Sequence, residues 1–192
     1  MQVIELSVFN RNLITIAVLA LAFIALYFFS RYSKTESDHR ADRLQKQYAK
    51  MTPALLASVP DEELAEAVVA NVFAKMSKQR PDLYVELPRQ TPGRCAVTAA
   101  WLVDRELDQS DFETLFASAC GPLAELAADG LDRLQAPSAA AAIRAALVAE
   151  TEEVRANCHA DYVEAREQED IPQKLIDYIR DNADEFTDGE EE

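Results

Sequence analysis

Five carboxylates crowd one short stretch of the sequence and raise the question of a calcium site. They are Asp104, Glu106, Asp108, Asp111 and Glu113. An EF-hand loop needs glycine at its sixth position, for a sharp turn, and glutamate at its twelfth, as a bidentate ligand. Counting from Asp104, these positions hold Gln109 and Leu115. The spacing therefore fails the calcium test and is typical of solvated acidic helix ends.

Candidate nucleophiles and bases are equally sparse. Cys158 and His159 are adjacent, but neighbours on a helix point about 100° apart, which is a poor geometry for a nucleophile and its base. Cys95, Cys120 and Cys158 form no CxxC pair of the kind that binds zinc or does redox chemistry, and free thiols fit a reducing compartment. The sequence has no glycine-rich phosphate loop, nucleophile elbow or HExxH motif. We therefore predict a protein that is not an enzyme, with no catalytic residue, cofactor or metal. A hydrolase whose carboxylate pair is assembled only by folding is the alternative left open.

Charge is distributed unevenly along the chain, whose net charge is −15. Residues 51–192 hold 30 Asp and Glu against 12 Lys and Arg, whereas residues 31–50 hold six Lys and Arg against three Asp and Glu. A domain this acidic repels phosphates, which argues against direct binding to nucleic acid. The charge favours a basic protein surface as the partner.

Residues 150–192 carry most of this negative charge, with 16 Asp and Glu against four Lys and Arg. One interpretation is an ordinary solvated face. The other is a docking surface whose charge steers a basic partner. The predicted acidic interaction surface consists of Glu150, Glu153, Asp161, Glu164, Glu167, Asp177, Asp181, Asp184 and Glu185.

An apolar segment precedes the acidic part of the chain. Residues 13–29 are apolar except for Thr15 and the Tyr27 hydroxyl, and no charge occurs from Asn12 to Ser30. Seventeen helical residues span about 25 Å, close to the lower limit for the hydrocarbon core of a bilayer. The residues that follow make a poor signal-peptide cleavage site. We predict an uncleaved, single-pass transmembrane helix over residues 13–30.

Flanking charges predict the orientation of this helix. Arg11 stands alone before it, whereas six Lys and Arg follow it between residues 31 and 50. Because positive residues stay on the cytoplasmic side, we expect the N-terminus outside and the C-terminal domain in the cytoplasm. The basic stretch is suited to lie against anionic headgroups. A contact face for partner helices in the membrane is predicted at Thr15, Ala22 and Ala25.

The remaining sequence favours helices, because glycine is scarce and capping and proline signals recur. We expect helices over about 35–51, 61–78, 92–108, 122–135, 139–168 and 173–185, with a short one starting near residue 110 and a short extended piece at 83–85. The predicted fold class is all-α. The predicted organisation is an N-terminal tail (1–12), the transmembrane helix (13–30), a basic juxtamembrane helix or linker (31–52), an acidic all-helical domain (53–186) and a disordered acidic tail (187–192).

Several segments occur in the order found in a known family. They are Pro60–Leu64, Pro92–Val97 leading to Trp101–Leu102, Phe112 and Phe116, Leu131–Pro137 before an alanine-rich helix, and Asp177–Asn182 before Phe186. In this order, residues 58–186 resemble the neisserial DNA-mimic protein family. The resemblance implies an all-α acidic domain. In the namesake member it also implies a surface that mimics DNA phosphates and so occupies a DNA-binding protein.

One stretch departs from the family pattern. The family usually carries a Glu-Val-Asn-Asn-Gly-Gly-Phe type of sequence after its tryptophan helix. Residues 106–112 occupy that place and contain neither glycine.

Together, these observations predict a non-enzymatic, membrane-anchored interaction module in the bacterial inner membrane, most simply an accessory or regulatory subunit of a membrane protein complex. Its anchor would pack beside partner helices, and its acidic domain would cover a basic cytoplasmic surface. The alternative is a membrane-tethered DNA mimic that sequesters a DNA-binding regulator.

Overall fold

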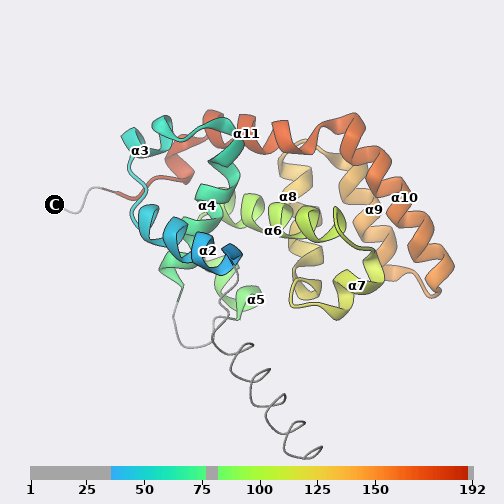
Figure 1. Ribbon diagram of the computed structural model, residues 1–192. Helices are drawn as coiled ribbons and strands as arrows, with labels where there is room; N and C mark the ends of the chain where they lie inside the picture. Colours follow the sequence, from blue (N-terminus) through green and yellow to red (C-terminus); the bar gives the residue numbers. More distant parts are fainter. Residues whose placement is uncertain (1–35, 77–81, 190–192) are drawn as a thin grey trace, which may run out of the picture. The chain divides into compact units, whose positions relative to one another are not determined.

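The computed structural model describes residues 36–76 and 82–189, and every regular element in this part of the chain is a helix (Figure 1). The predicted all-α class is confirmed for these residues. The predicted transmembrane helix and its contact face (Thr15, Ala22 and Ala25) lie outside the described residues. Among the helices within the described ranges, none is long and apolar enough to cross a membrane.

The chain divides into two units, Met1–Asp42 and Arg43–Glu192, and almost all described helices belong to the second. In order, the described helices are α2 (Glu36–Gln47), α3 (Pro53–Ser58), α4 (Asp61–Lys75), α5 (Leu83–Glu86), α6 (Pro92–Leu107), α7 (Phe112–Ala117), α8 (Ala124–Arg133), α9 (Pro137–Val148), α10 (Glu152–Glu169) and α11 (Ile171–Asp181), with short 3₁₀ turns at Leu87–Arg89, Gly121–Leu123 and Ala183–Glu185.

Side-chain caps fix where many of these helices begin. The side chains of Thr52, Thr91, Asp111 and Thr151 each accept a hydrogen bond from the backbone N–H three residues on, which satisfies one of the free donors of a helix start. Prolines occupy the first turns of α3, α6, α9 and α11, where their missing N–H has no cost. These signals are readable in the sequence, so α6 agrees with its predicted range to within about one turn; α4 also agrees, although no side chain caps its start.

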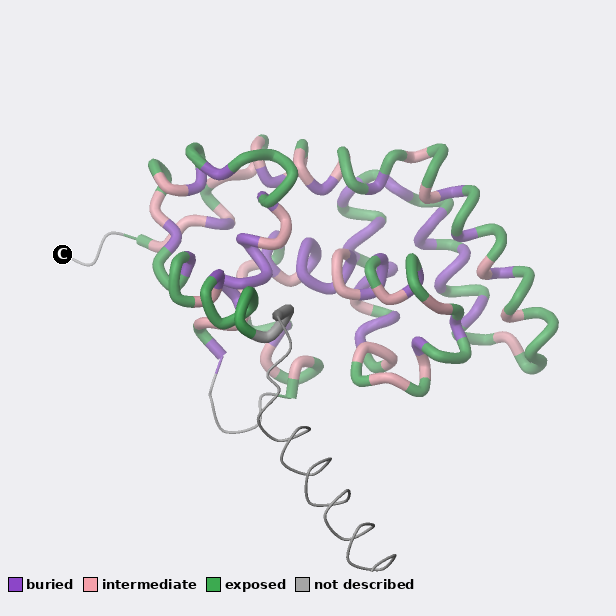
Figure 2. The backbone as a smooth tube through the Cα atoms, viewed as in Figure 1, coloured by how far each residue is buried: buried purple, intermediate pink, exposed green. Residues whose placement is uncertain are grey.

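Helix α6 is the centre of the second unit. It packs on α4 and on α8, while α8 packs on α9 and α9 on α10, so the C-terminal helices stack side by side (Figures 1 and 2). Many buried residues at these contacts are alanines, for example Ala99 and Ala100 on α6 and Ala127 and Ala128 on α8, which let helix axes approach closely. Helix α11 runs back along the stack to contact α4 and α6.

Helices α6 and α8 approach each other closely at Gly130. A Cβ atom there would lie 2.6 Å from the backbone carbonyl oxygen of Ala96. We therefore expect Gly130→Ala to lower the free energy of unfolding by about 1–3 kcal/mol through overpacking, measured by chemical denaturation. Helix propensity alone predicts the opposite sign, so a stabilised variant would contradict this packing. Gly189→Ala is the control, because a Cβ at that position meets nothing within 4 Å.

Two predicted elements are wrong. The single helix expected over 139–168 is broken into α9 and α10, because Ala149 is extended and Thr151 caps a new helix. The guanidinium of Arg155 donates to the Ala149 carbonyl oxygen over 3.2 Å, which helps to satisfy the end of α9. The expected extended piece at 83–85 is helix α5, whose first turn is capped by Asp82.

The predicted disordered tail also begins too early, because Thr187–Gly189 is described and Asp188 is bound to the domain. Its carboxylate accepts hydrogen bonds from the Met51 amide (2.8 Å) and from Arg94 (2.6 Å) and pairs with Lys75, and its own amide donates to the Met51 carbonyl (2.7 Å). Asn71 also donates to it. We call these five residues the Asp188 clamp. Acidic composition alone predicted disorder here, whereas a buried arginine that needs an anion holds the segment in place.

Candidate functional site

The outward face of α10 carries the clearest concentration of the predicted acidic residues. Thr151 caps the helix, and Glu152 and Glu153 lie in its first turn, where negative charge is favoured by the helix dipole. Cys158, Tyr162 and Ala165 are buried on the inner side. We give the name α10 acidic face to four exposed carboxylates of this helix: Glu153, Asp161, Glu164 and Glu167.

The two arginines of α10 turn away from this face. Arg155 pairs with Glu113 of α7. Arg166 makes two hydrogen bonds to Asp104 (2.7 and 3.3 Å) and an ion pair with Asp108 (3.2 Å), all on the α6 side. Within the described residues, no carboxylate of the α10 acidic face belongs to an ion pair; Glu164 accepts one hydrogen bond, from Gln168. The folding of both cations inward leaves the negative charge of the face uncompensated.

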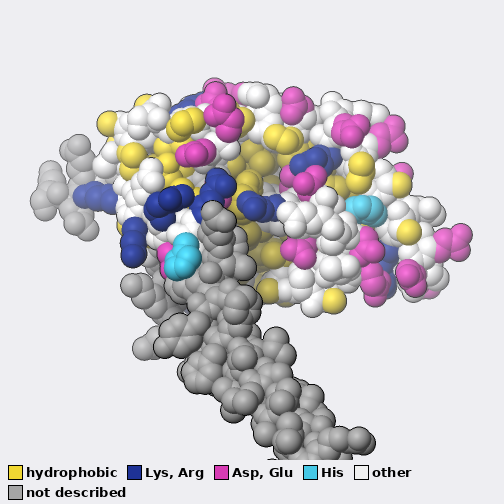
Figure 3. Space-filling model, in the orientation of Figure 1, with side chains coloured by type: hydrophobic (Ala, Val, Ile, Leu, Met, Phe, Trp, Pro, Cys, Tyr) yellow, Lys and Arg dark blue, Asp and Glu magenta, His cyan; other side chains and the backbone are white. Residues whose placement is uncertain are grey.

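The other predicted surface residues are placed less uniformly. Glu150, Asp177, Asp181 and Asp184 are exposed. Asp177 and Asp181 lie on the outer side of α11, opposite its buried residues Leu175 and Ile179. Glu185 is only half-buried and has an internal role, because its carboxylate accepts a hydrogen bond from the Gly93 amide at the start of α6 and pairs with Arg133 (3.2 Å). Figure 3 shows Asp and Glu side chains gathered over the part of the molecule where Figure 1 places α7 and α10.

Exposed apolar side chains border the α10 acidic face. Val154 and Val163 on α10 are 46% and 41% exposed, and Val148 at the end of α9 is 79% exposed. Protein-binding surfaces combine apolar contacts with a charged rim, whereas a surface that binds only through charge needs no such residues. This mixture is therefore suited to a protein partner.

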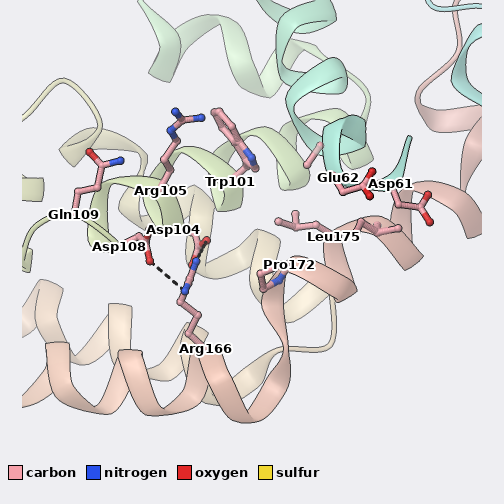
Figure 4. A pocket seen from close by; sticks show the side chains of 12 residues that line it. Asp61, Glu62, Trp101, Asp104, Arg105, Asp108, Gln109, Arg166, Pro172 and Leu175 are labelled. Atoms are coloured by element: carbon pink, nitrogen blue, oxygen red, sulfur yellow. Dashed lines mark hydrogen bonds and ion pairs between the residues drawn. The ribbon is translucent and has the colours of Figure 1, made fainter. Parts of the chain in front are cut away.

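A groove of about 410 Å³ lies between α4, α6 and α11, beside the inward-turned Arg166 (Figure 4). Trp101 and Leu175 line it, with Asp61 and Glu62 at the end formed by α4 and Asp108 near Arg166 at the other (Figure 4). The guanidinium of Arg105 lies 5.0 Å from the centre of the Trp101 ring, a cation–π geometry. The groove thus has an apolar floor and charged ends.

A second hollow, of about 750 Å³, adjoins the turn at 106–112 where the family motif is lost. It shares Asp108 and Arg166 with the first and is also lined by Asp111 and His159. Asp111 caps α7, and the hydrogen bond from the Thr114 amide (2.8 Å) is the main reason why its pKa is lowered from the ordinary value. The His159 ring lies edge-on to Phe112, with the ring centres 6.0 Å apart.

Three of the five carboxylates tested for a calcium loop are taken up by contacts within the fold. Asp104 turns inward to Tyr162 and Arg166, Asp111 caps a helix, and Glu113 pairs with Arg155. Among the described residues, no group of three or more His, Cys, Asp or Glu is arranged to hold a metal ion.

The three cysteines are free thiols, and none is in a setting that activates it as a nucleophile. Burial, together with nearby Asp129, raises the pKa of the Cys95 thiol, and burial with nearby Glu106 raises the pKa of the Cys120 thiol. A raised pKa lowers the thiolate fraction and so disfavours nucleophilic chemistry at both positions. Cys158 is buried on the inner side of α10.

These features define an acidic, all-helical domain with an uncompensated carboxylate face. Residues 89–192, more than half of the chain, match the family described as DMP19-like protein, and the chain belongs to that family. The resemblance drawn from segment order is thereby confirmed. No curated protein and no solved structure matches the chain.

Proposed function

We propose that this protein is a non-enzymatic interaction module that docks the α10 acidic face on a basic surface of a partner protein. The observation that carries the proposal is the separation of charge on α10, where Arg155 and Arg166 are bound on the inner side and the outer carboxylates form no ion pair with any described residue. Such a face steers a basic partner and orients it on encounter. The neighbouring valines supply apolar contact once the partner has docked.

The proposal includes membrane attachment through residues 13–30, which makes the protein an accessory or regulatory subunit of a membrane complex with its acidic domain in the cytoplasm. The support for attachment is the uncharged apolar segment and the excess of Lys and Arg that follows it. Vesicle flotation of the full-length protein after an alkaline carbonate wash tests this part separately. Release of the protein by the wash would refute an integral anchor.

Removing charge from the α10 acidic face is expected to release the partner. We expect Glu153→Gln, Glu164→Gln and Glu167→Gln together to reduce co-purification in mild detergent at low salt by about tenfold or more, because three partner charges lose their counterparts. High salt should have the same effect on the unaltered protein, since exposed charges are screened. The readout is the amount of partner recovered per mole of full-length protein.

A matched variant controls for net charge. Glu62→Gln, Glu63→Gln and Glu125→Gln remove the same three charges from exposed positions on α4 and α8. This variant is expected to retain the partner. Equal losses in both variants would show that overall charge, and not the α10 acidic face, governs the interaction.

A DNA mimic is the second candidate, favoured by membership of the DMP19-like family and by the alignment of carboxylates along one helix. From Glu153 to Glu167 the four carboxylates cover about 21 Å of helix axis, or about one charge per 7 Å along the row. One strand of DNA carries a charge every 3.4 Å or so, so the row is about half as dense. Competition between the full-length protein and duplex DNA for the co-purified partner decides between the candidates. A partner that binds no DNA would exclude the mimic.

A further inference from the structure

Among the described residues of the second unit, free positive charge is concentrated on one face of α2 and the turn after it. Arg43, Lys46 and Lys50 are exposed there, whereas Leu44 and Tyr48 are buried on the other side. We call the three cations the α2 basic face. Figure 3 shows Lys and Arg side chains clustered in the region where Figure 1 places α2.

The cations elsewhere in the described chain are already engaged. Between residues 75 and 180, eight described Lys and Arg residues form ion pairs, Arg105 lies over Trp101, and Lys174 donates to the Gln135 carbonyl. Arg43, Lys46 and Lys50 form no ion pair with any described residue. The α2 basic face is therefore a site of uncompensated positive charge on an otherwise acidic domain.

The packing beneath this face holds it in a fixed position. Tyr48 and Met51 are buried, and the Tyr48 carbonyl oxygen accepts a hydrogen bond from the buried Asn71 side chain (2.8 Å). In the Asp188 clamp, two further hydrogen bonds fix the Met51 backbone: its amide donates to the Asp188 carboxylate, and its carbonyl accepts from the Asp188 amide. The three cations are thus carried on a rigid support and not on a loose linker.

We propose that the α2 basic face binds the anionic headgroups of the membrane surface. The inference rests on the membrane attachment in the proposed function and adds a lipid class and a binding site to it. Twelve residues lie between Ser30 and Arg43, and even a fully extended chain from one to the other spans no more than about 45 Å, which keeps the basic face near the bilayer. Basic residues next to a membrane segment are attracted to anionic lipid, and screening limits repulsion from the acidic helices to carboxylates within about 10 Å of the surface.

Trypsin protection on vesicles tests this proposal with the full-length protein. The protein is reconstituted in phosphatidylcholine, with or without about 30% phosphatidylglycerol, and cleavage is followed after Arg43, Lys46 and Lys50. We expect cleavage there to slow by about fivefold or more on the anionic vesicles, and the effect to disappear in about 0.5 M NaCl. Cleavage after the exposed Arg89 normalises for the fraction of protein that faces the protease.

Two variants separate local from overall charge. Lys46→Gln with Lys50→Gln should remove most of the protection at Arg43, whereas Arg105→Gln with Arg144→Gln removes two distant cations and should leave it intact. Equal cleavage on neutral and anionic vesicles would overturn the proposal. If both kinds of vesicle protect these sites equally, the proposal is overturned in favour of apolar insertion. If protection depends on protein concentration, it is overturned in favour of a second copy of the chain.

Flotation of the same samples tests membrane attachment separately from lipid binding by the α2 basic face. Protein that floats with the vesicles without protection contradicts the α2 basic face alone. Protein that does not float contradicts membrane attachment as well.

Discussion

Replacing Asp188 by alanine is expected to lower the free energy of unfolding by about 3–5 kcal/mol. The Arg94 side chain is only 7% exposed and Asp188 15%, so removing the carboxylate leaves a buried guanidinium without its anion. The Met51 amide and Lys75 lose the same partner. Chemical denaturation of the full-length protein in detergent measures the effect, and Asp184→Ala, an exposed carboxylate nearby, is the control.

A double variant separates the ion pair from general disruption. Arg94→Met combined with Asp188→Ala should cost less than the sum of the single changes, because neither partner is then left buried and unpaired. A loss below about 1 kcal/mol for Asp188→Ala, the range of an exposed pair, would show that the segment after Phe186 contributes nothing. Faster hydrogen exchange near Met51 in the single variant would locate the effect at the Asp188 clamp.

The Asp188 clamp also predicts the direction in which the free energy of unfolding changes with pH. Burial raises the pKa of Asp188, but hydrogen bonds from Lys75, the Met51 amide and Arg94 outweigh it and lower the pKa below the ordinary 3.8. Because the folded pKa lies below the unfolded one, the stabilisation is complete above the unfolded pKa and is lost as the pH falls through the folded pKa. The stability difference between the unaltered protein and Asp188→Ala should therefore shrink between about pH 5 and pH 2.

Replacing Asp104 by alanine is expected to have a comparable effect, a loss of about 3–5 kcal/mol. Asp104 is 7% exposed, accepts a hydrogen bond from the buried Tyr162 hydroxyl (2.9 Å) and binds Arg166. Without it, a buried hydroxyl and a partly buried cation lose their acceptor together. Chemical denaturation again provides the measurement. Asp108→Asn is the control, because Asp108 is 54% exposed and its ion pair with Arg166 is worth less than about 1 kcal/mol.

The same change has a functional consequence. Arg166 freed from Asp104 would turn a cation towards the α10 acidic face, next to Glu167. Partner binding should then fall even at temperatures where Asp104→Ala remains folded, and Asp104→Ala combined with Arg166→Ala should restore part of it. Unchanged binding in Asp104→Ala would separate the inner ion pairs from the docking surface.

Sequence reasoning was most successful where the signal is local. Thr91 and Pro92 act on their own helix, so they predicted α6 without knowledge of the rest of the fold, and the short helix expected from near residue 110 is α7, whose cap is Asp111. The break between α9 and α10 was missed because Ala149 has no strong preference to end a helix. The break depends on the Thr151 cap and on Arg155 reaching back to the Ala149 carbonyl.

The candidate site could be predicted only in part, because it depends on contacts between residues far apart in the sequence. The sequence predicted an acidic interaction surface, but it could not predict where the intervening cations point. Arg155 and Arg166 are turned inward by Glu113 and Asp104, which lie more than 40 positions away in the chain. The internal role of Glu185 and the binding of Asp188 likewise depend on partners about 90 positions away, Gly93 and Arg94. Uncompensated charge is a property of the folded state, and composition alone does not reveal it.

Zero-length crosslinking of the native complex tests the central claim most directly. A carbodiimide joins carboxylates to lysines in contact, so the complex purified in mild detergent at low salt reports which carboxylates meet the partner. We predict crosslinks from Glu153, Asp161, Glu164 and Glu167 to lysines of the partner protein, and their loss at high salt. Crosslinks that instead come from Glu62, Glu63 or Glu125, or a protein that purifies alone at both salt concentrations, would contradict docking through the α10 acidic face.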